Sequence, residues 1–267
     1  MAENIYTGFH AIEEKIRHYD FQQKKSGKKP LNLEVKIFYS KAGPRVKKIL
    51  SLAKDAGIEC LEKDEKFLDS KVAALPEEAR EHRGILLLAT GDAEQVRASN
   101  SVQLEQWLLK CPEKATVLIL DSVTDPHNVG AVIRSMDQFG ADLLILPDHR
   151  SAGDVFTSEI VARTSAGASA YVPVASVTNL VRSVQLLKDA GFWIFGADAG
   201  GQSLQNVEFP QKTCLVMGSE GSGISHLLED SCDNLVSIPT CGKIDSLNVS
   251  VAAGVLLYER YRQSLTL

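Results

Sequence analysis

From residue 116 onward, short apolar runs of strand length alternate with stretches of helical character. Polar residues do not interrupt runs such as T-V-L-I-L at 116–120. A strand that is apolar at every position must be buried on both faces, and the intervening helices can supply that cover. The pattern therefore predicts an α/β fold on a parallel sheet. The predicted strands are 116–120, 143–147, 171–174, 192–197, 214–218 and 235–239, and the predicted helices are 128–139, 154–166, 178–190, 223–231 and 248–262.

The first 90 residues have a different organisation. Apolar residues recur at helical spacing over 5–16, which predicts an amphipathic helix. We expect 1–90 to form a small α/β unit, 91–115 to be a polar linker with one helix, and 116–267 to be a larger α/β domain. Further elements predicted in the small unit are a strand over L-E-V-K-I-F-Y, a helix over 45–56, and strands at 58–61 and 84–89.

Positive charge is concentrated near the N-terminus, although the net charge of the chain is −5. Residues 1–90 hold 17 Lys and Arg against 14 Asp and Glu, whereas the remainder holds 12 against 20. A basic patch on an acidic protein is typical of phosphate recognition. We expect a charged loop over 21–30 to contact RNA through Lys24, Lys25, Lys28 and Lys29. A solvated loop with no partner remains the alternative.

Composition excludes several other classes of protein. The five cysteines are scattered and form no C-x-x-C pair, so neither a disulfide framework nor a zinc site is indicated. We expect no metal, reduced thiols and a cytoplasmic location. No apolar run approaches the length of a membrane span, and residues 1–6 lack the pattern of a signal peptide. We therefore expect no membrane partner.

Three polar motifs follow predicted strands in the second half of the chain. They are D-P-H-N-V-G-A-V-I-R at 125–134, L-V-M-G-S-E-G-S-G-I at 215–224, and I-P-T-C-G-K-I-D-S-L-N-V-S-V-A at 238–252. Ligands of open parallel sheets bind beyond the carboxyl ends of the strands. The motifs therefore predict a small-molecule pocket built from loops at that edge.

Common nucleotide-binding motifs do not fit the glycine-rich segment. The residues 218–223 match G-x-x-x-x-G, but Ile224 stands where a phosphate-binding loop needs Lys. A dinucleotide fingerprint fails at His226, where its third glycine should be. These failures disfavour a nucleotide-dependent oxidoreductase. The segment is better explained as a tight turn against a neutral or zwitterionic ligand, or as a plain strand-to-helix turn.

The three motifs, in this order, resemble those of the SpoU/TrmH family of RNA ribose 2′-O-methyltransferases, within the SPOUT class. The resemblance covers 116–262 and, more loosely, I-Y-T-G-F-H-A-I at 5–12 and H-R-G-I at 82–85. It implies a parallel sheet whose chain threads a deep trefoil knot, preceded by a small α/β RNA-binding domain like that of certain ribosomal proteins. It also implies a homodimer with the site at the interface, S-adenosylmethionine (S-adenosyl-L-methionine) as methyl donor, and an RNA substrate.

The resemblance also implies roles for particular residues. The cofactor is expected to contact Met217, Gly218, Ile238, Thr240 and Leu247, largely through backbone groups. The catalytic polar residues are expected to be Asn128, Arg134, Glu220, Ser246 and Asn248.

Elementary chemistry suggests how those polar residues would act. Arg134 would hydrogen-bond the reacting hydroxyl, since a guanidinium stays protonated and is a poor base. Asn128 would orient Arg134 or cap its helix, and Glu220 would pair with Arg134 or support it from behind. Ser246 or Asn248 would cap the last helix.

The closest match within the family is to enzymes that methylate a guanosine of 23S rRNA, so we expect 23S rRNA or a large-subunit precursor as substrate. Two alternatives remain open. One is a tRNA ribose 2′-O-methyltransferase, and the other is a non-catalytic RNA-binding factor for ribosome assembly. The chain departs from the family pattern at 21–30, 71–81 and 91–115, which bears on the choice of RNA. The apolar face of the last helix is expected to be core or a dimer face.

Overall fold

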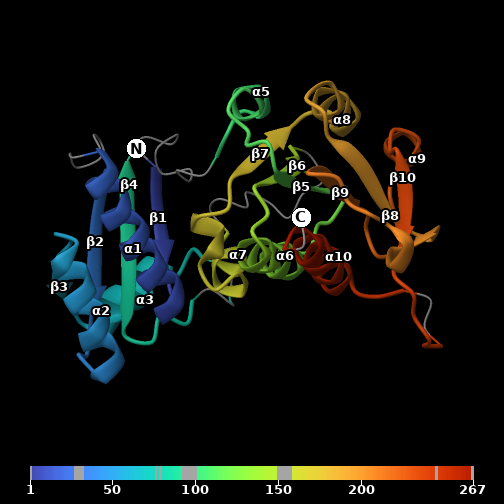
Figure 1. The fold of residues 1–267 in the computed structure, drawn as a ribbon. Coiled ribbons are helices and arrows are strands. Elements are labelled where there is room, and N and C mark those ends of the chain that lie inside the picture. Colours follow the sequence, from blue (N-terminus) through green and yellow to red (C-terminus); the bar gives the residue numbers. More distant parts are fainter. Residues whose placement is uncertain are drawn as a thin grey trace. The chain divides into compact units, whose positions relative to one another are not determined.

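The computed structural model describes residues 2–26, 33–75, 77, 80–91, 101–148, 158–243 and 246–265. By internal contacts the chain divides into two compact units (Figure 1). The first comprises residues within 1–99 and 156–171, and the second comprises residues within 100–155 and 172–267. None of the helices in the described ranges is both long and apolar enough to cross a membrane.

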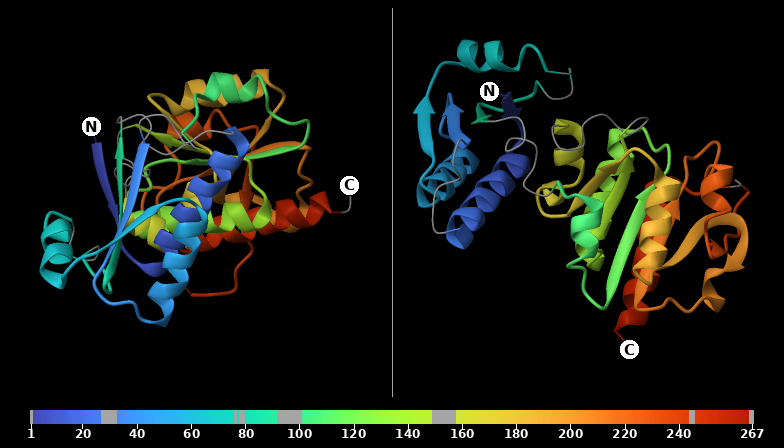
Figure 2. Two further views of the ribbon diagram at one scale, coloured as in Figure 1. Left: turned by 90° about the vertical axis from the view of Figure 1, so that its left-hand side faces the viewer. Right: turned by 90° about the horizontal axis from the view of Figure 1, so that it is seen from above.

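The first unit is a four-stranded sheet with helices on both faces. Strands β1, β4 and β2 are antiparallel neighbours, and β3 pairs parallel to β2. Helices α1 and α2 cover one face and α3 covers the other (Figure 2). The bounds are β1 Ala2–Tyr6, α1 Phe9–Ser26, β2 Leu33–Tyr39, α2 Pro44–Asp55, β3 Glu59–Glu62, α3 Glu65–Val72, β4 Ile85–Gly91, α7 Glu159–Thr164 and the 3-10 turn η2 Ala168–Ala170.

The side chains of β4 point alternately to the two faces of the sheet and contribute to the hydrophobic cluster on each face. Ile85 and Leu87 are buried in the cluster under α1 and α2, whereas Leu86 and Leu88 are buried against α3. Successive side chains of a strand point to opposite faces, so one apolar run can serve two layers. The sequence reasoning missed α3, which begins where the Asp64 side chain accepts a hydrogen bond from the Phe67 amide at 2.8 Å.

The helix predicted over 5–16 is wrong at both ends. Ile5 pairs with Leu88 in the β1–β4 ladder, and Gly8 (φ 80°) separates this strand from α1. The pairing of β1 with β4 therefore determines the structure of these first residues, in spite of the helical spacing of their apolar side chains. Helix α1 then continues to Ser26, so Lys24 and Lys25 belong to a helix and not to the expected loop. Lys28 and Lys29 lie outside the described residues.

The second unit confirms the predicted parallel sheet. Its six strands run in the order β10-β8-β9-β5-β6-β7, and every neighbouring pair is parallel. Helices α6 and α10 lie side by side on one face, and α5 and α8 lie on the other (Figure 1). The bounds are α5 Leu104–Leu108, β5 Ala115–Leu120, α6 Pro126–Phe139, β6 Leu143–Pro147, β7 Val174–Val177, α8 Leu180–Asp189, β8 Trp193–Ser203, η3 Leu204–Asn206, β9 Lys212–Met217, α9 His226–Glu229, β10 Asn234–Ser237 and α10 Val249–Ser264.

One local prediction in this unit needs correction. The strand expected at 171–174 lies at Val174–Val177, because Pro173 has no N–H for the ladder and offers only its carbonyl, to the Leu144 amide at 2.9 Å. The helix expected within 91–115 lies at Leu104–Leu108. Leu104 of α5 is buried in the core of the sheet, so this part of the chain packs as a covering helix.

Candidate active site

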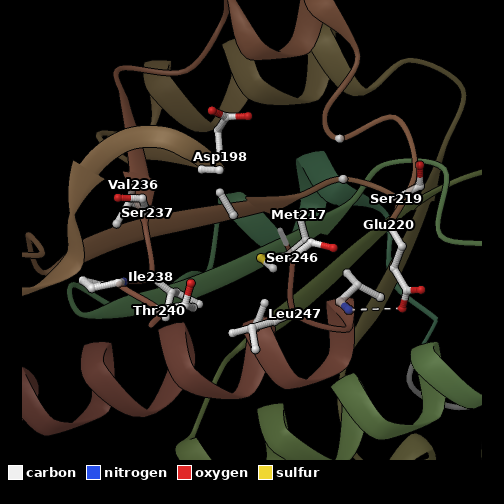
Figure 3. A pocket seen from close by; sticks show the side chains of 17 residues that line it. Asp198, Met217, Ser219, Glu220, Val236, Ser237, Ile238, Thr240, Ser246 and Leu247 are labelled. Carbon is white, nitrogen blue, oxygen red and sulfur yellow. Dashed lines mark hydrogen bonds between the residues drawn. The ribbon is translucent and has the colours of Figure 1, made fainter. Parts of the chain in front are cut away.

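A cavity of about 440 Å³ lies beyond the carboxyl ends of β9 and β10, beside the middle of β8 and the start of α10 (Figure 3). Its volume falls within the range of roughly 300–1,000 Å³ that is typical of small-molecule sites. The wall combines apolar side chains with carboxylates and hydroxyls. The lining residues are Ala197, Asp198, Ala199, Met217, Gly218, Ser219, Glu220, Gly223, Val236, Ser237, Ile238, Pro239, Thr240, Ser246, Leu247, Val249 and Ala252.

The turn after β9 forms one wall of the cavity. Ser219 and Gly223 exchange two backbone hydrogen bonds, of 3.1 and 3.0 Å, which close the turn. A Cβ on Gly218 would lie 2.0 Å from the carbonyl carbon of Gly223, so only glycine fits there. At the far end of the turn, the buried Asp121 carboxylate accepts a hydrogen bond from the Ser225 amide at 2.8 Å. The turn is therefore held from β5 as well as β9.

All five residues expected to contact the cofactor line this cavity. Met217 and Gly218 come from the end of β9, Ile238 and Thr240 follow β10, and Leu247 precedes α10. Figure 3 shows their side chains around one space, although they come from three separate segments of the chain. The sheet order explains this, because β8 pairs with both β9 and β10 and so brings their carboxyl ends close together.

Sequence reasoning missed Asp198, which lines the cavity from the end of the apolar run in β8. Its Oδ1 accepts a hydrogen bond from the Gly200 amide at 2.7 Å, which fixes the carboxylate against its own segment of β8. The signal was available, since the run predicted as a strand stops at 197 and ligands bind beyond strand ends.

A polar cluster at the rim of the cavity joins the three motifs. The Glu220 Oε1 atom accepts hydrogen bonds from Asn248 Nδ2 at 2.6 Å and from Asn128 Nδ2 at 3.4 Å. It also accepts a hydrogen bond from the Val249 amide at 3.3 Å (Figure 3). Asn248 Nδ2 also donates to Asn128 Oδ1 at 2.9 Å. Three of the five predicted catalytic residues therefore contact one another, and Glu220 connects them to the cavity wall.

Helix capping is divided between two residues of the motifs. Asn248 caps α10, since its Oδ1 accepts hydrogen bonds from the amides of Ser250 and Val251 at 2.9 and 3.3 Å. Helix α6 is capped by Asp125, whose Oδ1 accepts from the His127 amide at 2.9 Å. The prediction that Asn128 caps this helix is therefore wrong. Ser246 lines the cavity and is exposed.

Arg134 stands apart from this cluster. Its side chain is exposed and has no hydrogen-bond or ion-pair partner among the residues that the structure describes. Six positions separate it from Asn128, which places the two on different faces of α6 at about 100° per residue. The expected contacts of Arg134 with Asn128 and Glu220 are therefore not made within one chain.

The model of the SpoU rRNA Methylase family matches residues 115–258, which is more than half of the chain and contains all three motifs. The chain belongs to the SpoU rRNA methylase family. The resemblance inferred from the motifs is thereby confirmed.

Two relatives align over most of the chain. The 23S rRNA (guanosine-2′-O-)-methyltransferase RlmB of Neisseria meningitidis serogroup B is 37% identical over 258 residues, covering 96% of this chain and 94% of that protein. An uncharacterized tRNA/rRNA methyltransferase of Borreliella burgdorferi is 38% identical over 230 residues, covering 85% of this chain and 97% of that protein.

A solved structure supports the fold. The SpoU methyltransferase AviRb of Streptomyces viridochromogenes, in complex with the cofactor AdoMet, superposes with a TM-score of 0.71. The match covers 99% of this chain and 91% of that chain, at 24% sequence identity. Both units of the α/β architecture thus occur together in that protein.

Proposed function

We propose that this protein transfers a methyl group from S-adenosylmethionine to the ribose 2′-hydroxyl of a guanosine in 23S rRNA. The observation that carries the proposal is the meeting of the three motifs. The second and third motifs wall one cavity, and at its rim Glu220 accepts hydrogen bonds from Asn128 of the first motif and Asn248 of the third. Family membership and the RlmB relative, aligned over nearly the whole chain, support the same reaction and the same substrate.

The cavity fits S-adenosylmethionine in size and chemistry. Met217, Ile238 and Leu247 offer apolar contact for the adenine ring and the thioether chain. Asp198 and Glu220 place carboxylates at the wall, which suits a ligand that carries positive charge. When bound, the cofactor supplies a methyl group activated by its positively charged sulfur.

The residues of the chain must then position and activate the hydroxyl, which is a weak nucleophile at neutral pH. Holding two reactants in line can supply about 7–11 kcal/mol, so positioning is the largest contribution. The Asn128–Glu220–Asn248 cluster holds the segment that carries Ser246 and Leu247 against the cavity. Ser246, which lines the cavity, hydrogen-bonds the substrate in this proposal.

Arg134 acts on the developing negative charge. Its guanidinium remains protonated, so it donates hydrogen bonds to the 2′-hydroxyl and the adjacent phosphate and lowers the pKa of the hydroxyl. A phosphate oxygen or a water molecule takes the proton. This role needs an Arg134 with unused donors, and the exposed side chain donates to none of the residues that the structure describes.

The protein acts as a homodimer, and Arg134 of one chain completes the site of the other. Two observations support this arrangement. Arg134 has no partner among the described residues of its own chain. The outer face of α10, which packs on α6 and begins at the rim of the cavity, is apolar and exposed at Val251, Val255, Tyr258, Tyr261 and Leu265.

Finer features of the molecule follow from the family and remain part of the proposal. Residues 116–267 form the methyltransferase domain and thread a deep trefoil knot. The N-terminal unit, 1–90, is a ribosomal-protein-like RNA-binding domain joined through the 91–115 segment. Its lysines at 24, 25, 28 and 29 contact RNA phosphates, and the enzyme works in the cytoplasm.

Isothermal calorimetry and methyl transfer test the proposal together. S-adenosylmethionine and its demethylated product should both bind in the absence of RNA. With labelled cofactor, label should appear at a guanosine ribose of transcribed 23S rRNA and not in tRNA. Label in tRNA alone would establish the tRNA alternative. RNA binding without cofactor binding would make the protein a non-catalytic assembly factor.

A further inference from the structure

The two N-terminal segments that carry the looser family resemblance meet in a second cavity. Residues 5–12 and 82–85 are far apart in sequence, but the β1–β4 ladder pairs Tyr6 with Leu87 and so brings them together. The cavity has a volume of about 250 Å³, below the usual range for small-molecule pockets. It is lined by Thr7, Gly8, Phe9, His10, Ala11, Arg45, Glu81, Arg83 and Arg163.

Three arginines from separate elements line this cavity. Arg45 lies in the first turn of α2, Arg83 precedes β4, and Arg163 lies in α7. Two carboxylates accompany them: Glu13 contacts Arg45 at 3.1 Å, and Glu81 contacts Arg83 at 3.0 Å. A guanidinium has five N–H donors, so these contacts leave further donors of Arg45 and Arg83 available.

The backbone around the cavity also favours an anion. Helix α1, of 18 residues, begins at Phe9 and has no acidic residue in its first turn, so the positive end of its dipole faces the cavity uncompensated. Arg45 sits in the first turn of α2, where a positive charge is disfavoured. Arg83 adopts a left-handed φ of 51°, which is uncommon for a non-glycine residue. Unfavourable placements of this kind cluster at binding sites.

Two of these arginines affect the ionisation of the Glu81 carboxyl. Its pKa is lowered by the hydrogen bond and charge of Arg83 and, to a smaller extent, by the charge of Arg163. Both Glu81 and Arg83 are largely exposed, and exposed ion pairs contribute little to stability. A stronger anion can therefore replace the carboxylate at small cost.

We propose that this cavity binds a backbone phosphate of the substrate RNA, held by Arg83 and Arg163, with Glu81 occupying the place of that phosphate in the free protein. The inference rests on the proposed function, since it takes RNA as the substrate. It adds a phosphate site distinct from the lysine cluster at 24–29.

The test uses the full-length protein and transcribed 23S rRNA, with dissociation constants measured over a series of KCl concentrations. Arg83→Asn and Arg163→Gln should each weaken binding and reduce the slope of log affinity against log salt by about 0.7–0.9, the effect of one lost phosphate contact. Asparagine tolerates a left-handed φ, so Arg83→Asn should fold. Lys66→Gln removes one exposed positive charge of the same unit outside the cavity and is the matched control.

Glu81→Gln supplies the opposite expectation. Removing the competing carboxylate should tighten RNA binding, whereas loss of a merely structural ion pair would leave it unchanged or weaker. Equal slopes for Lys66→Gln and the arginine variants, or no gain for Glu81→Gln, would overturn the inference. Calorimetry with inorganic phosphate forms a second arm: phosphate binding that the arginine variants lose, with unchanged RNA slopes, would assign the cavity to a small anion instead.

Failure here and failure of the proposed function give different results. If the cavity does not bind RNA, all variants should still bind S-adenosylmethionine and methylate 23S rRNA with unchanged salt dependence. If the proposed function is wrong, the wild-type protein itself should fail to bind cofactor or to methylate 23S rRNA.

Discussion

The exposed position of Arg134 supports its proposed role in the reaction. Its side chain has no partner in the described part of its own chain and can therefore donate to the substrate. Replacing it with Ala should leave folding and cofactor binding normal and slow methyl transfer by about 10²–10³, the usual effect of losing one donor to a developing oxyanion. Arg134→Lys should restore little, because an ammonium cannot hold hydroxyl and phosphate as a planar fork does. Single-turnover rates at saturating RNA measure this, and near-normal rates would remove Arg134 from the mechanism.

Gly218 and Gly221 lie three residues apart in the same turn. Replacement by alanine should impair the protein at Gly218 and have no effect at Gly221. A Cβ at Gly218 would meet the backbone of Gly223 at 2.0 Å, whereas a Cβ at Gly221 has nothing within 4 Å. Gly218→Ala should therefore destabilise the protein by about 1–3 kcal/mol, as overpacking does, and weaken S-adenosylmethionine binding. Gly221→Ala should change neither. Denaturant unfolding and calorimetry on the pair check this, and similar behaviour of both variants would contradict the role assigned to the turn.

At the scale of elements, the start of α10 combines a helix cap with the rim of the active site. The two roles of Asn248 use different atoms: Oδ1 caps the helix, and Nδ2 donates to Glu220 and Asn128. Asn248→Ala should cost about 1 kcal/mol in stability, the usual effect of losing such a cap, and should slow methyl transfer.

Asn248→Asp separates the two roles. Aspartate can still cap α10, so stability should stay near that of the wild-type protein apart from repulsion with Glu220. Methyl transfer should nevertheless fall, because a carboxylate cannot donate to Glu220. Thermal unfolding and transfer rates on both variants distinguish these effects. An active Asn248→Asp enzyme would show that the hydrogen bonds to Glu220 are not needed for the reaction.

At the scale of the whole molecule, the proposed homodimer would form through the outer face of α10. Tyr258 is 51% exposed and packs edge-on against Phe139 of α6, with ring centroids 5.6 Å apart. Tyr258→Glu should convert a dimer into a monomer with much lower transfer activity, since Arg134 would lose the site of the other chain. Val181→Glu, an exposed change on α8, is the control. Sedimentation velocity measures both, and a monomeric wild-type protein would contradict the proposal.

Mixing two impaired variants tests directly whether each active site is built from both chains of the dimer. In a mixed dimer of Arg134→Ala and Gly218→Ala chains, one site combines an intact cavity with an intact Arg134 from the other chain. An equal mixture should then recover roughly a quarter of wild-type activity, because about half of the dimers are mixed and each has one complete site. If Arg134 served its own chain, mixing would restore nothing.

Much of the second unit could be predicted from the sequence, because its signals are local. Continuous apolar runs specified a buried parallel sheet, and the strand ends located the edge that carries the cavity. The five residues expected to contact the cofactor, which the family resemblance supplied, all line that cavity. Predictions that depended on which strands pair with one another were less accurate. Ile5 has helical spacing but belongs to β1, since its partner Leu88 lies 83 positions away.

Residue chemistry and periodicity therefore determined the class of fold and the edge that carries the site, and the resemblance of the three motifs indicated the family. Only the tertiary structure decided which groups meet. It joined Asn128, Glu220 and Asn248, left Arg134 outside that cluster, and gathered Arg45, Arg83 and Arg163 around one cavity. The physical reason is that helical and strand periods act over a few residues, whereas these contacts depend on how distant strands pair and how helices rotate against the sheet.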